Sequence, residues 1–156
     1  MFKPAVLVAV REGQRLVALQ RIFLDPETAR YTGKATIGSL GMCAWRGGGI
    51  GPTIGLAEGF ETARAWSLLH KLPCWATLGS RRFGLATIPD SVTELILAGD
   101  CDIAGRRAVN RASHRYASDN RVIRVDFPKG YKDWAQALEA LETQKRDTMG
   151  AGRCQR

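Results

Sequence analysis

The feature that most constrains the fold is a regular alternation of short apolar runs and amphipathic stretches that begins at residue 53. Apolar runs predict four strands, at residues 53–57, 73–78, 94–98 and 121–127. Helical spacing of apolar side chains predicts three helices, at residues 60–72, 104–117 and 133–143. Strands that alternate with helices pair in parallel, because each helix carries the chain back to the same end of the sheet. The sequence therefore predicts an α/β fold, with a four-stranded, mainly parallel sheet flanked by helices.

The first 52 residues have a different pattern. Residues 5–11 and 15–24 are apolar runs on either side of a turn in which Gly13 supplies the positive φ, which is typical of a β-hairpin. Residues 25–37 are polar and predict a loop, and residues 36–45 predict a further short strand.

The glycine-rich stretch 46–52 lacks the Gly-Lys-Ser/Thr of a phosphate-binding P-loop, so we interpret it as a flexible connector. We expect three parts in all: a β-hairpin and linker segment (residues 1–52) that packs on the core, a core domain (residues 53–143), and a disordered basic tail (residues 144–156).

The charge of the chain is strongly positive, at +8 over 156 residues. This balance favours a polyanionic partner such as nucleic acid, and an ordinary basic surface is the alternative. No apolar run reaches the roughly 18 residues of a membrane span, and the opening residues lack the pattern of a signal peptide. We therefore expect a cytoplasmic protein that does not enter a membrane. The four cysteines lack the spacing of a zinc site.

Two of the predicted strands end in acidic residues. Glu58 follows the first strand, and Asp100 and Asp102 follow the third. If these strands are neighbours, the three carboxylates meet at one edge of the sheet. Carboxylates that lie so near to one another raise each other's pKa unless a cation neutralises them. Mg²⁺ prefers such oxygen ligands. Asp102 also precedes a predicted helix, where a role as N-cap would explain it without any metal.

Both acidic motifs resemble those of the Toprim domain, the Rossmann-like catalytic fold shared by bacterial-type primases, topoisomerases and certain nucleases. The motifs are Glu-Gly-Phe-Glu-Thr-Ala at residues 58–63 and Asp-Cys-Asp-Ile-Ala-Gly-Arg at residues 100–106. The resemblance is strongest to the Toprim core of phage- and plasmid-type primases and covers roughly residues 53–141. It implies catalytic roles for Glu58, Asp100 and Asp102, with one or two Mg²⁺ (or Mn²⁺) ions as cofactor.

Two further acids have positions in this resemblance. Glu61 matches a second acid of the first motif, and Asp133 falls where the family has a further metal-binding acid before its last helix. The family usually continues with Asn-Asp, whereas Ala135 and Gln136 stand here. The alternative for Asp133 is the N-cap of the last helix.

Basic residues of the leading segment and of two loops are implied to bind nucleotide or nucleic acid. They are Arg21, Lys34, Arg46, Arg81, Arg82 and Arg106. As a group they fit a groove that follows a phosphate backbone, whereas each taken alone fits a solvated surface.

Three functions fit these observations. The first is a primase core that uses nucleotides to make primers on single-stranded DNA, with a helicase or another replication protein as a possible partner. The second is a Toprim nuclease or topoisomerase-like enzyme that cleaves a strand. The third is a non-catalytic nucleic-acid-binding module, which the joint presence of Glu58, Asp100 and Asp102 disfavours because such a module has no use for clustered carboxylates.

Overall fold

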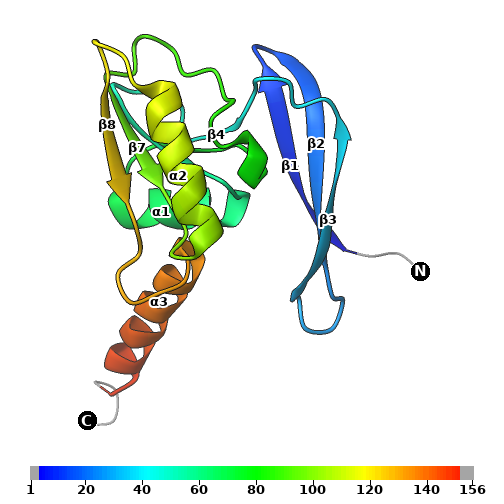
Figure 1. Ribbon diagram of the computed structural model, residues 1–156. Helices are drawn as coiled ribbons and strands as arrows, with labels where there is room; N and C mark the ends of the chain where they lie inside the picture. The colour runs from blue at the N-terminus through cyan, green and yellow to red at the C-terminus, as the bar shows by residue number, and fades with distance from the viewer. Residues whose placement is uncertain (1–3, 152–156) are drawn as a thin grey trace.

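The computed structural model describes residues 4–151, which form two sheets and three helices (Figure 1). The N-terminal sheet is antiparallel, with the order β1 (Ala5–Glu12), β2 (Arg15–Leu24) and β3 (Tyr31–Gly38). The second sheet has the order β4-β6-β5-β7-β8. Its strands are β4 (Trp45–Gly47), β5 (Thr53–Ala57), β6 (Cys74–Ala76), β7 (Glu94–Ala98) and β8 (Val122–Asp126). The helices are α1 (Phe60–His70), α2 (Ile103–Tyr116) and α3 (Trp134–Ala151), with a short 3₁₀ turn η1 (Ser80–Arg82).

The second sheet confirms the predicted α/β fold. β5 pairs in parallel with β6 on one side and β7 on the other, and β7 pairs in parallel with β8. The predicted count of four strands was short by one, because β4 adds an antiparallel edge to β6. β4 has only three residues and ends in glycine, so its own sequence carries no strand pattern, and its pairing to β6 defines it.

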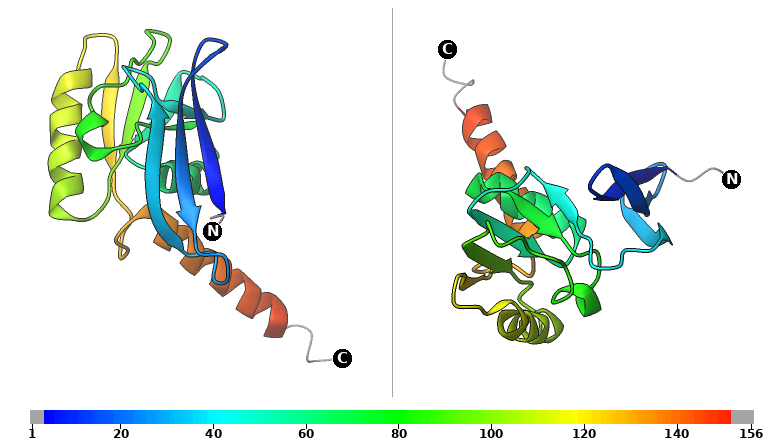
Figure 2. Two further views of the ribbon diagram at one scale, coloured as in Figure 1. Left: turned by 90° about the vertical axis from the view of Figure 1, so that its right-hand side faces the viewer. Right: turned by 90° about the horizontal axis from the view of Figure 1, so that it is seen from above.

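Helices α1 and α2 cover opposite faces of this sheet (Figures 1 and 2). Alternate residues of the strands supply the two cores: Leu56 and Leu97 pack with Ala108 of α2, whereas Ala57 and Ala98 pack with Trp66 of α1. The sheet and α1 approach closely at Gly55, where an added Cβ would lie 2.6 Å from the Trp66 ring.

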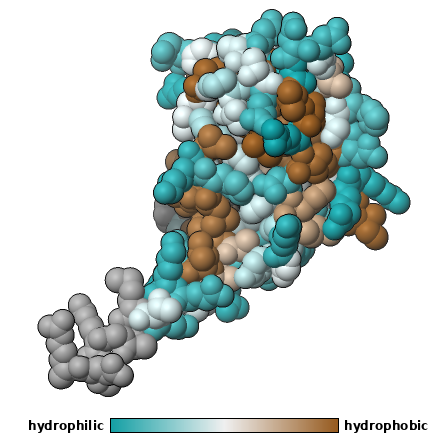
Figure 3. All heavy atoms as spheres, turned by 90° about the vertical axis from the view of Figure 1, so that its left-hand side faces the viewer, coloured by the Kyte–Doolittle hydropathy of each residue, from teal (hydrophilic) through white to brown (hydrophobic). Residues whose placement is uncertain are grey.

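Helix α3 packs on α1 and then extends away from the sheets (Figure 2). Figure 3 shows apolar residues gathered where these two helices meet. A pocket of about 350 Å³ at this junction is lined by apolar side chains that include Leu69, Trp134 and Leu141.

The predicted disordered tail was wrong for residues 144–151, which continue α3; the rest of that tail lies outside the described residues. Gln144, Lys145 and Arg146 are good helix formers, so their polarity does not end the helix. No helix within residues 4–151 is long and apolar enough to cross a membrane.

The predicted N-terminal hairpin is confirmed, because β1 pairs antiparallel with β2 and Gly13 in their turn has a positive φ. A third strand, β3, extends this hairpin to a three-stranded sheet. Residues 25–37 were predicted to be a loop, but β3 occupies most of that stretch and pairs with β2 from Tyr31 to Gly38. The predicted strand at residues 36–45 was also wrong, because β3 ends at Gly38 and β4 begins only at Trp45. β3 is polar, contains two glycines and is largely exposed, so it lacks the apolar alternation that marks a strand.

One face of the N-terminal sheet packs against the α1 side of the larger sheet. Val8, Val10, Ala18 and Ile22 are buried in the same apolar cluster as Trp66. This packing places the N-terminal sheet beside the sheet that carries the acidic motifs.

Candidate active site

The acidic motifs meet at the carboxyl ends of two paired strands. β5 and β7 run in parallel, with Ala57 opposite Ala98, so Glu58 and the 99–102 turn leave the sheet side by side. In Figure 1 the arrows of β7 and β8 point to this edge, which lies at the lower end of the sheet near the start of α3. The two strands are therefore neighbours, which is the condition on which the sequence argument for a shared acidic edge rests.

Close backbone contacts shape the second acidic turn. A Cβ added at Gly99 would lie 2.4 Å from the Phe127 ring, and one added at Gly105 would lie 2.5 Å from the backbone oxygen of Asp100. The backbone N–H of Cys101 donates to the carbonyl of Lys132 at 2.8 Å, which ties this turn to the loop before α3. The turn at Asp100 is thus held tightly from two sides.

Asp100 is the carboxylate most affected by its surroundings. Burial, and then the negative charges of Glu58, Asp133 and Asp102, raise the pKa of Asp100 to about 6. The Thr62 hydroxyl donates a long hydrogen bond of 3.5 Å to Asp100 and lowers this pKa in part. The four acids therefore lie within one electrostatic field, which a cation would relieve.

Glu58 lies in the same field and also near a positive charge. Burial raises the pKa of Glu58, and the charge of Asp102 raises it further. Lys34 of β3 and the backbone N–H of Ser80 act in the opposite direction. The charge of Lys34, on the N-terminal sheet, therefore acts on the carboxylates of the acidic edge.

Two of the acids also cap helices, as their alternative interpretations proposed. Asp102 Oδ1 accepts a hydrogen bond from Gly105 N at 2.7 Å at the start of α2. Asp133 Oδ1 accepts one from Gln136 N at 2.9 Å, and the Gln136 side chain in turn accepts from Lys132 N. This reciprocal capping gives Gln136 a structural role where the Toprim primases usually have another residue. Because each cap uses one carboxylate oxygen, the other oxygen is left for a further ligand.

Replacing Asp102 separates the cap from the metal role. Asparagine caps a helix about as well as aspartate, whereas alanine costs about 1 kcal/mol. We expect Asp102→Asn to unfold in urea close to the wild-type midpoint and Asp102→Ala to be less stable by about that amount, with metal-dependent activity lost in both. Full activity of Asp102→Asn would show that Asp102 is only a cap.

The acids fit an open magnesium site rather than a closed one. No three acidic, histidine or cysteine side chains within residues 4–151 form a complete metal-binding group. Mg²⁺ commonly takes only one or two carboxylates, keeps several waters and completes its shell with substrate phosphate. Asp100 with Asp102 or Glu58 could supply such a set. Glu61 is exposed on the first turn of α1 and is not one of the charges that raise the pKa of Asp100.

The six basic residues lie in different places. Lys34 is opposite Ile22 in the sheet register and so lies on the packed face of the N-terminal sheet, whereas Arg21 is opposite Leu7 and lies on the outer face. Arg21 stacks on Phe23 there, with its guanidinium carbon 5.2 Å from the ring centroid. The structure therefore directs Lys34, and not Arg21, toward the acidic edge.

The other four basic residues belong to the larger sheet and its loops. Arg106 lies in the first turn of α2 over the Phe127 ring, and Arg46 of β4 lies over the Trp75 ring. Arg81 is exposed on η1. Arg82 instead donates to three backbone carbonyls, those of Gly41, Cys43 and Thr77.

We expect Arg81 and Arg82 to differ sharply when each is replaced with alanine. Arg82→Ala removes three hydrogen bonds that join the 41–43 segment to the end of β6 and should lower the free energy of unfolding by about 2 kcal/mol. Arg81→Ala should change it by less than about 0.5 kcal/mol, because the side chain is exposed. Urea unfolding of the two variants measures this difference, and equal stabilities would contradict the structural role of Arg82.

Thr62 belongs to the site although its role was not predicted. It is 7% exposed and lies in the first turn of α1, where its hydroxyl faces Asp100. A polar residue on the inner face of a helix four positions after Glu58 was the available signal.

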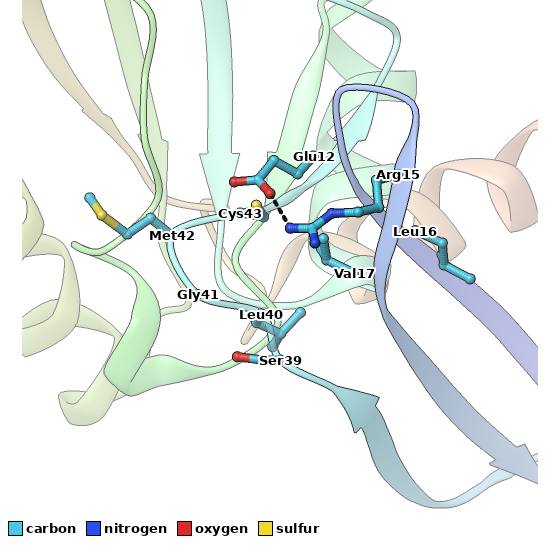
Figure 4. A pocket seen from close by; sticks show the side chains of 9 residues that line it. All are labelled: Glu12, Arg15, Leu16, Val17, Ser39, Leu40, Gly41, Met42 and Cys43. Carbon is cyan, nitrogen blue, oxygen red and sulfur yellow. Dashed lines mark hydrogen bonds and ion pairs between the residues drawn. The ribbon is translucent and has the colours of Figure 1, made fainter.

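A pocket of about 360 Å³ lies away from these acids, between the β1–β2 turn and the segment 39–43. Figure 4 shows Glu12 and Arg15 paired at this pocket, at a distance of 2.6 Å. None of the four clustered acids lines it, so the pocket is not part of the candidate active site.

This fold and its acidic edge define a Toprim domain. The Toprim family model matches residues 53–142, and the chain belongs to this family. No match was found among curated protein sequences.

The structure is similar to solved structures of primase fragments and domains. The primase fragment of the bacteriophage T7 primase-helicase protein matches 92% of this chain and 60% of its own, with a TM-score of 0.63 and 19% identity. A DNA primase domain from Pseudomonas aeruginosa matches 89% of this chain and 48% of its own, with a TM-score of 0.60 and 22% identity. The chain thus spans less than two thirds of the length of each of these two structures. Because about nine tenths of this chain is matched, the similarity includes the N-terminal sheet as well as the Toprim domain.

A third similar structure contains ligands. It is described as bacteriophage T7 lagging-strand DNA polymerase interacting with primase domains bound to an RNA/DNA hybrid and dTTP. It matches 92% of this chain and 74% of its own, with a TM-score of 0.60 and 18% identity. These likenesses establish the fold.

Proposed function

We propose that this chain is the catalytic core of a primase, a nucleotidyltransferase that synthesises primers on single-stranded DNA with Mg²⁺ or Mn²⁺. The observation that carries the proposal is the convergence of Glu58, Asp100 and Asp102 at the ends of two paired parallel strands in a Toprim domain. The likeness to primase fragments across both sheets favours this activity over the others of the family.

Asp100 and Asp102 would hold the divalent ion, with Glu58 and Asp133 as further candidate ligands. When bound, the ion supplies positive charge that stabilises the phosphate oxygens of the reaction. Glu58 either shares the ion or accepts the proton of the attacking 3′-hydroxyl, and its raised pKa favours proton acceptance. Thr62 orients the Asp100 carboxylate through its hydroxyl.

The basic residues would position the polyanions. Lys34 lies near enough to Glu58 for its charge to lower the pKa of that carboxyl, and we infer that it contacts the phosphates of a nucleotide. Arg106, in the first turn of α2, would add to this contact, because anions bind at helix N-termini. Arg46 and Arg81 would contact the template strand. Arg21 and Arg82, also predicted to bind nucleic acid, have positions that favour structural roles.

We propose single-stranded DNA and nucleotides as the ligands, and a helicase or another replication protein as the partner. In the T7 complex the primase domains are bound to an RNA/DNA hybrid and dTTP, and the T7 fragment comes from a primase-helicase. A phage or plasmid origin and a place in the cytoplasm stay predictions of the sequence.

The test is an incubation of the protein with labelled single-stranded DNA, ribonucleotides and Mg²⁺ or Mn²⁺. New RNA products that depend on the metal and disappear in Asp100→Asn support the primase. Shortened DNA would assign a Toprim nuclease instead, and a shifted but intact band with no product would assign a binding module.

A further inference from the structure

A small pocket that none of the clustered acids lines carries two arginines, of which only Arg46 has a role in the proposed function. Arg11 and Arg46 line this pocket of about 210 Å³ with the small residues Ala9, Gly13 and Ala44. Gly13 belongs to the β1–β2 turn, which lies at the upper end of the molecule in Figure 1, away from the carboxyl ends of β7 and β8. None of Glu58, Asp100, Asp102 and Asp133 lines the pocket, which is therefore separate from the acidic site.

Both guanidinium groups are held without an acidic partner. Arg11 donates to the backbone carbonyl of Gln14 at 2.9 Å, and Arg46 is stacked with its guanidinium carbon 4.5 Å from the Trp75 ring centroid. The four ion pairs within residues 4–151 involve Arg15, His70, Arg124 and Arg146, so neither pocket arginine is neutralised there. Each guanidinium has five N–H donors, and most of these stay free to bind a ligand.

A neighbouring arginine, Arg15, differs from these two because an acidic side chain neutralises its charge. Arg15, on the other side of the same turn, is paired with Glu12 at the adjacent pocket (Figure 4). Arg11 and Arg46 instead come from two different sheets and present two positive charges to one space. The two guanidinium groups repel each other, and an anion bound between them would relieve this repulsion.

We propose that the pocket between Arg11 and Arg46 is a phosphate-binding site. Planar guanidinium groups bind phosphate through paired hydrogen bonds. The pocket is smaller than the roughly 300–1,000 Å³ of small-molecule sites, so it suits a phosphate group rather than a whole nucleotide. The phosphate comes either from the backbone of a nucleic-acid strand or from a free phosphate compound. This site does not involve the acids, and for a backbone phosphate it rests on the proposed function, in which Arg46 contacts the template strand.

The experiment uses the full chain without divalent metal, so that its outcome does not depend on primer synthesis. The first arm titrates the protein with inorganic pyrophosphate and follows the NMR signals of the arginine Nε–H groups. The second arm measures binding of a labelled 12-nucleotide oligo(dT) by Arg11→Gln, Arg46→Gln and the control Arg124→Gln at several salt concentrations. The Arg124→Gln substitution removes one positive charge, as the other two do, but from β8, which lies at the opposite edge of the sheet from β4.

For a site that holds a backbone phosphate, we expect pyrophosphate to shift the Arg11 and Arg46 signals but not that of Arg124. Each pocket variant should then bind the oligonucleotide about fivefold more weakly at 0.1 M salt, with a salt slope reduced by about 0.7, and the control should change neither. Shifted signals with unchanged DNA binding would assign the site to a free phosphate compound. Unshifted signals would overturn the proposal, whether or not the variants bind DNA more weakly, because the arginines would then act only as general surface charge.

Discussion

Replacing Asp100 with asparagine is expected to abolish metal-dependent activity while stabilising the metal-free protein at neutral pH. Loss of the charged ligand should lower primer synthesis at least about a hundredfold, equivalent to about 2.7 kcal/mol of transition-state stabilisation. The fold should persist, because the asparagine side-chain oxygen can still accept the hydrogen bond that the Thr62 hydroxyl donates. Primer assays and urea unfolding in EDTA measure the two effects.

The sign of the stability change follows from the pKa of Asp100. This pKa is about 6 in the folded protein, against an ordinary value of 3.8. Between these values the unfolded chain releases the proton more readily than the folded protein, so the stability of the wild type falls as the pH rises from about 4 to about 6. Because Asp100 is partly exposed, solvent screening reduces the effect to about 1–2 kcal/mol.

The difference in unfolding free energy between Asp100→Asn and the wild type isolates this effect. It should grow in favour of the variant from pH 4 to pH 6 and be constant above that. Added Mg²⁺ or Mn²⁺ should stabilise the wild type but not the variant, because only the wild type gains from neutralising the charge. Identical pH profiles, or equal stabilisation of both proteins by the metal, would contradict the clustering of the acids.

Replacing Gly105 with alanine is expected to destabilise the protein, although alanine normally strengthens a helix. In an exposed helix interior, alanine is more favourable than glycine by about 1 kcal/mol. At Gly105, however, the added Cβ would lie 2.5 Å from the backbone oxygen of Asp100. The turn must shift, which we expect to cost about 1–3 kcal/mol overall. A displacement of about 1 Å at Asp100 should also lower activity about a hundredfold.

The matched control lies in the same helix. Asn110 is exposed on α2, so Asn110→Ala should raise the free energy of unfolding by a few tenths of a kcal/mol and leave activity unchanged. Thermal unfolding and primer assays compare the two variants. A Gly105→Ala protein as stable and active as the wild type would show that the contact between α2 and the Asp100 turn is not tight.

The parallel sheet was predictable because its inner strands are covered on both faces. β5 and β7 read as continuous apolar runs, and the ends of such strands mark where ligands bind. Glu58, Asp100 and Asp102 were therefore proposed as site residues from their positions at these strand ends together with the resemblance of their motifs to the Toprim domain. In contrast, β3 is polar and held by its pairing to β2, so no local pattern revealed it.

The parts of the site that come from other elements were harder to predict. The hydrogen bond from Cys101 to Lys132 joins two loops that are distant in the sequence, and it brings Asp133 into the field of Asp100. Likewise, Lys34 and Arg21 look equivalent in the sequence, because the face on which each lies depends on strand register. Only the assembled sheet distinguishes the lysine whose charge acts on Glu58 from the arginine on the outer face.

The most direct test of the shared metal site is the anomalous difference map of a crystal soaked in Mn²⁺. The structure predicts a peak at the carboxyl ends of β5 and β7, with a carboxylate oxygen of Asp100 and one of Asp102 or Glu58 at about the 2.1 Å of a magnesium-like ligand. A map with no peak there, and with these carboxylates engaged in separate ion pairs, would contradict the account.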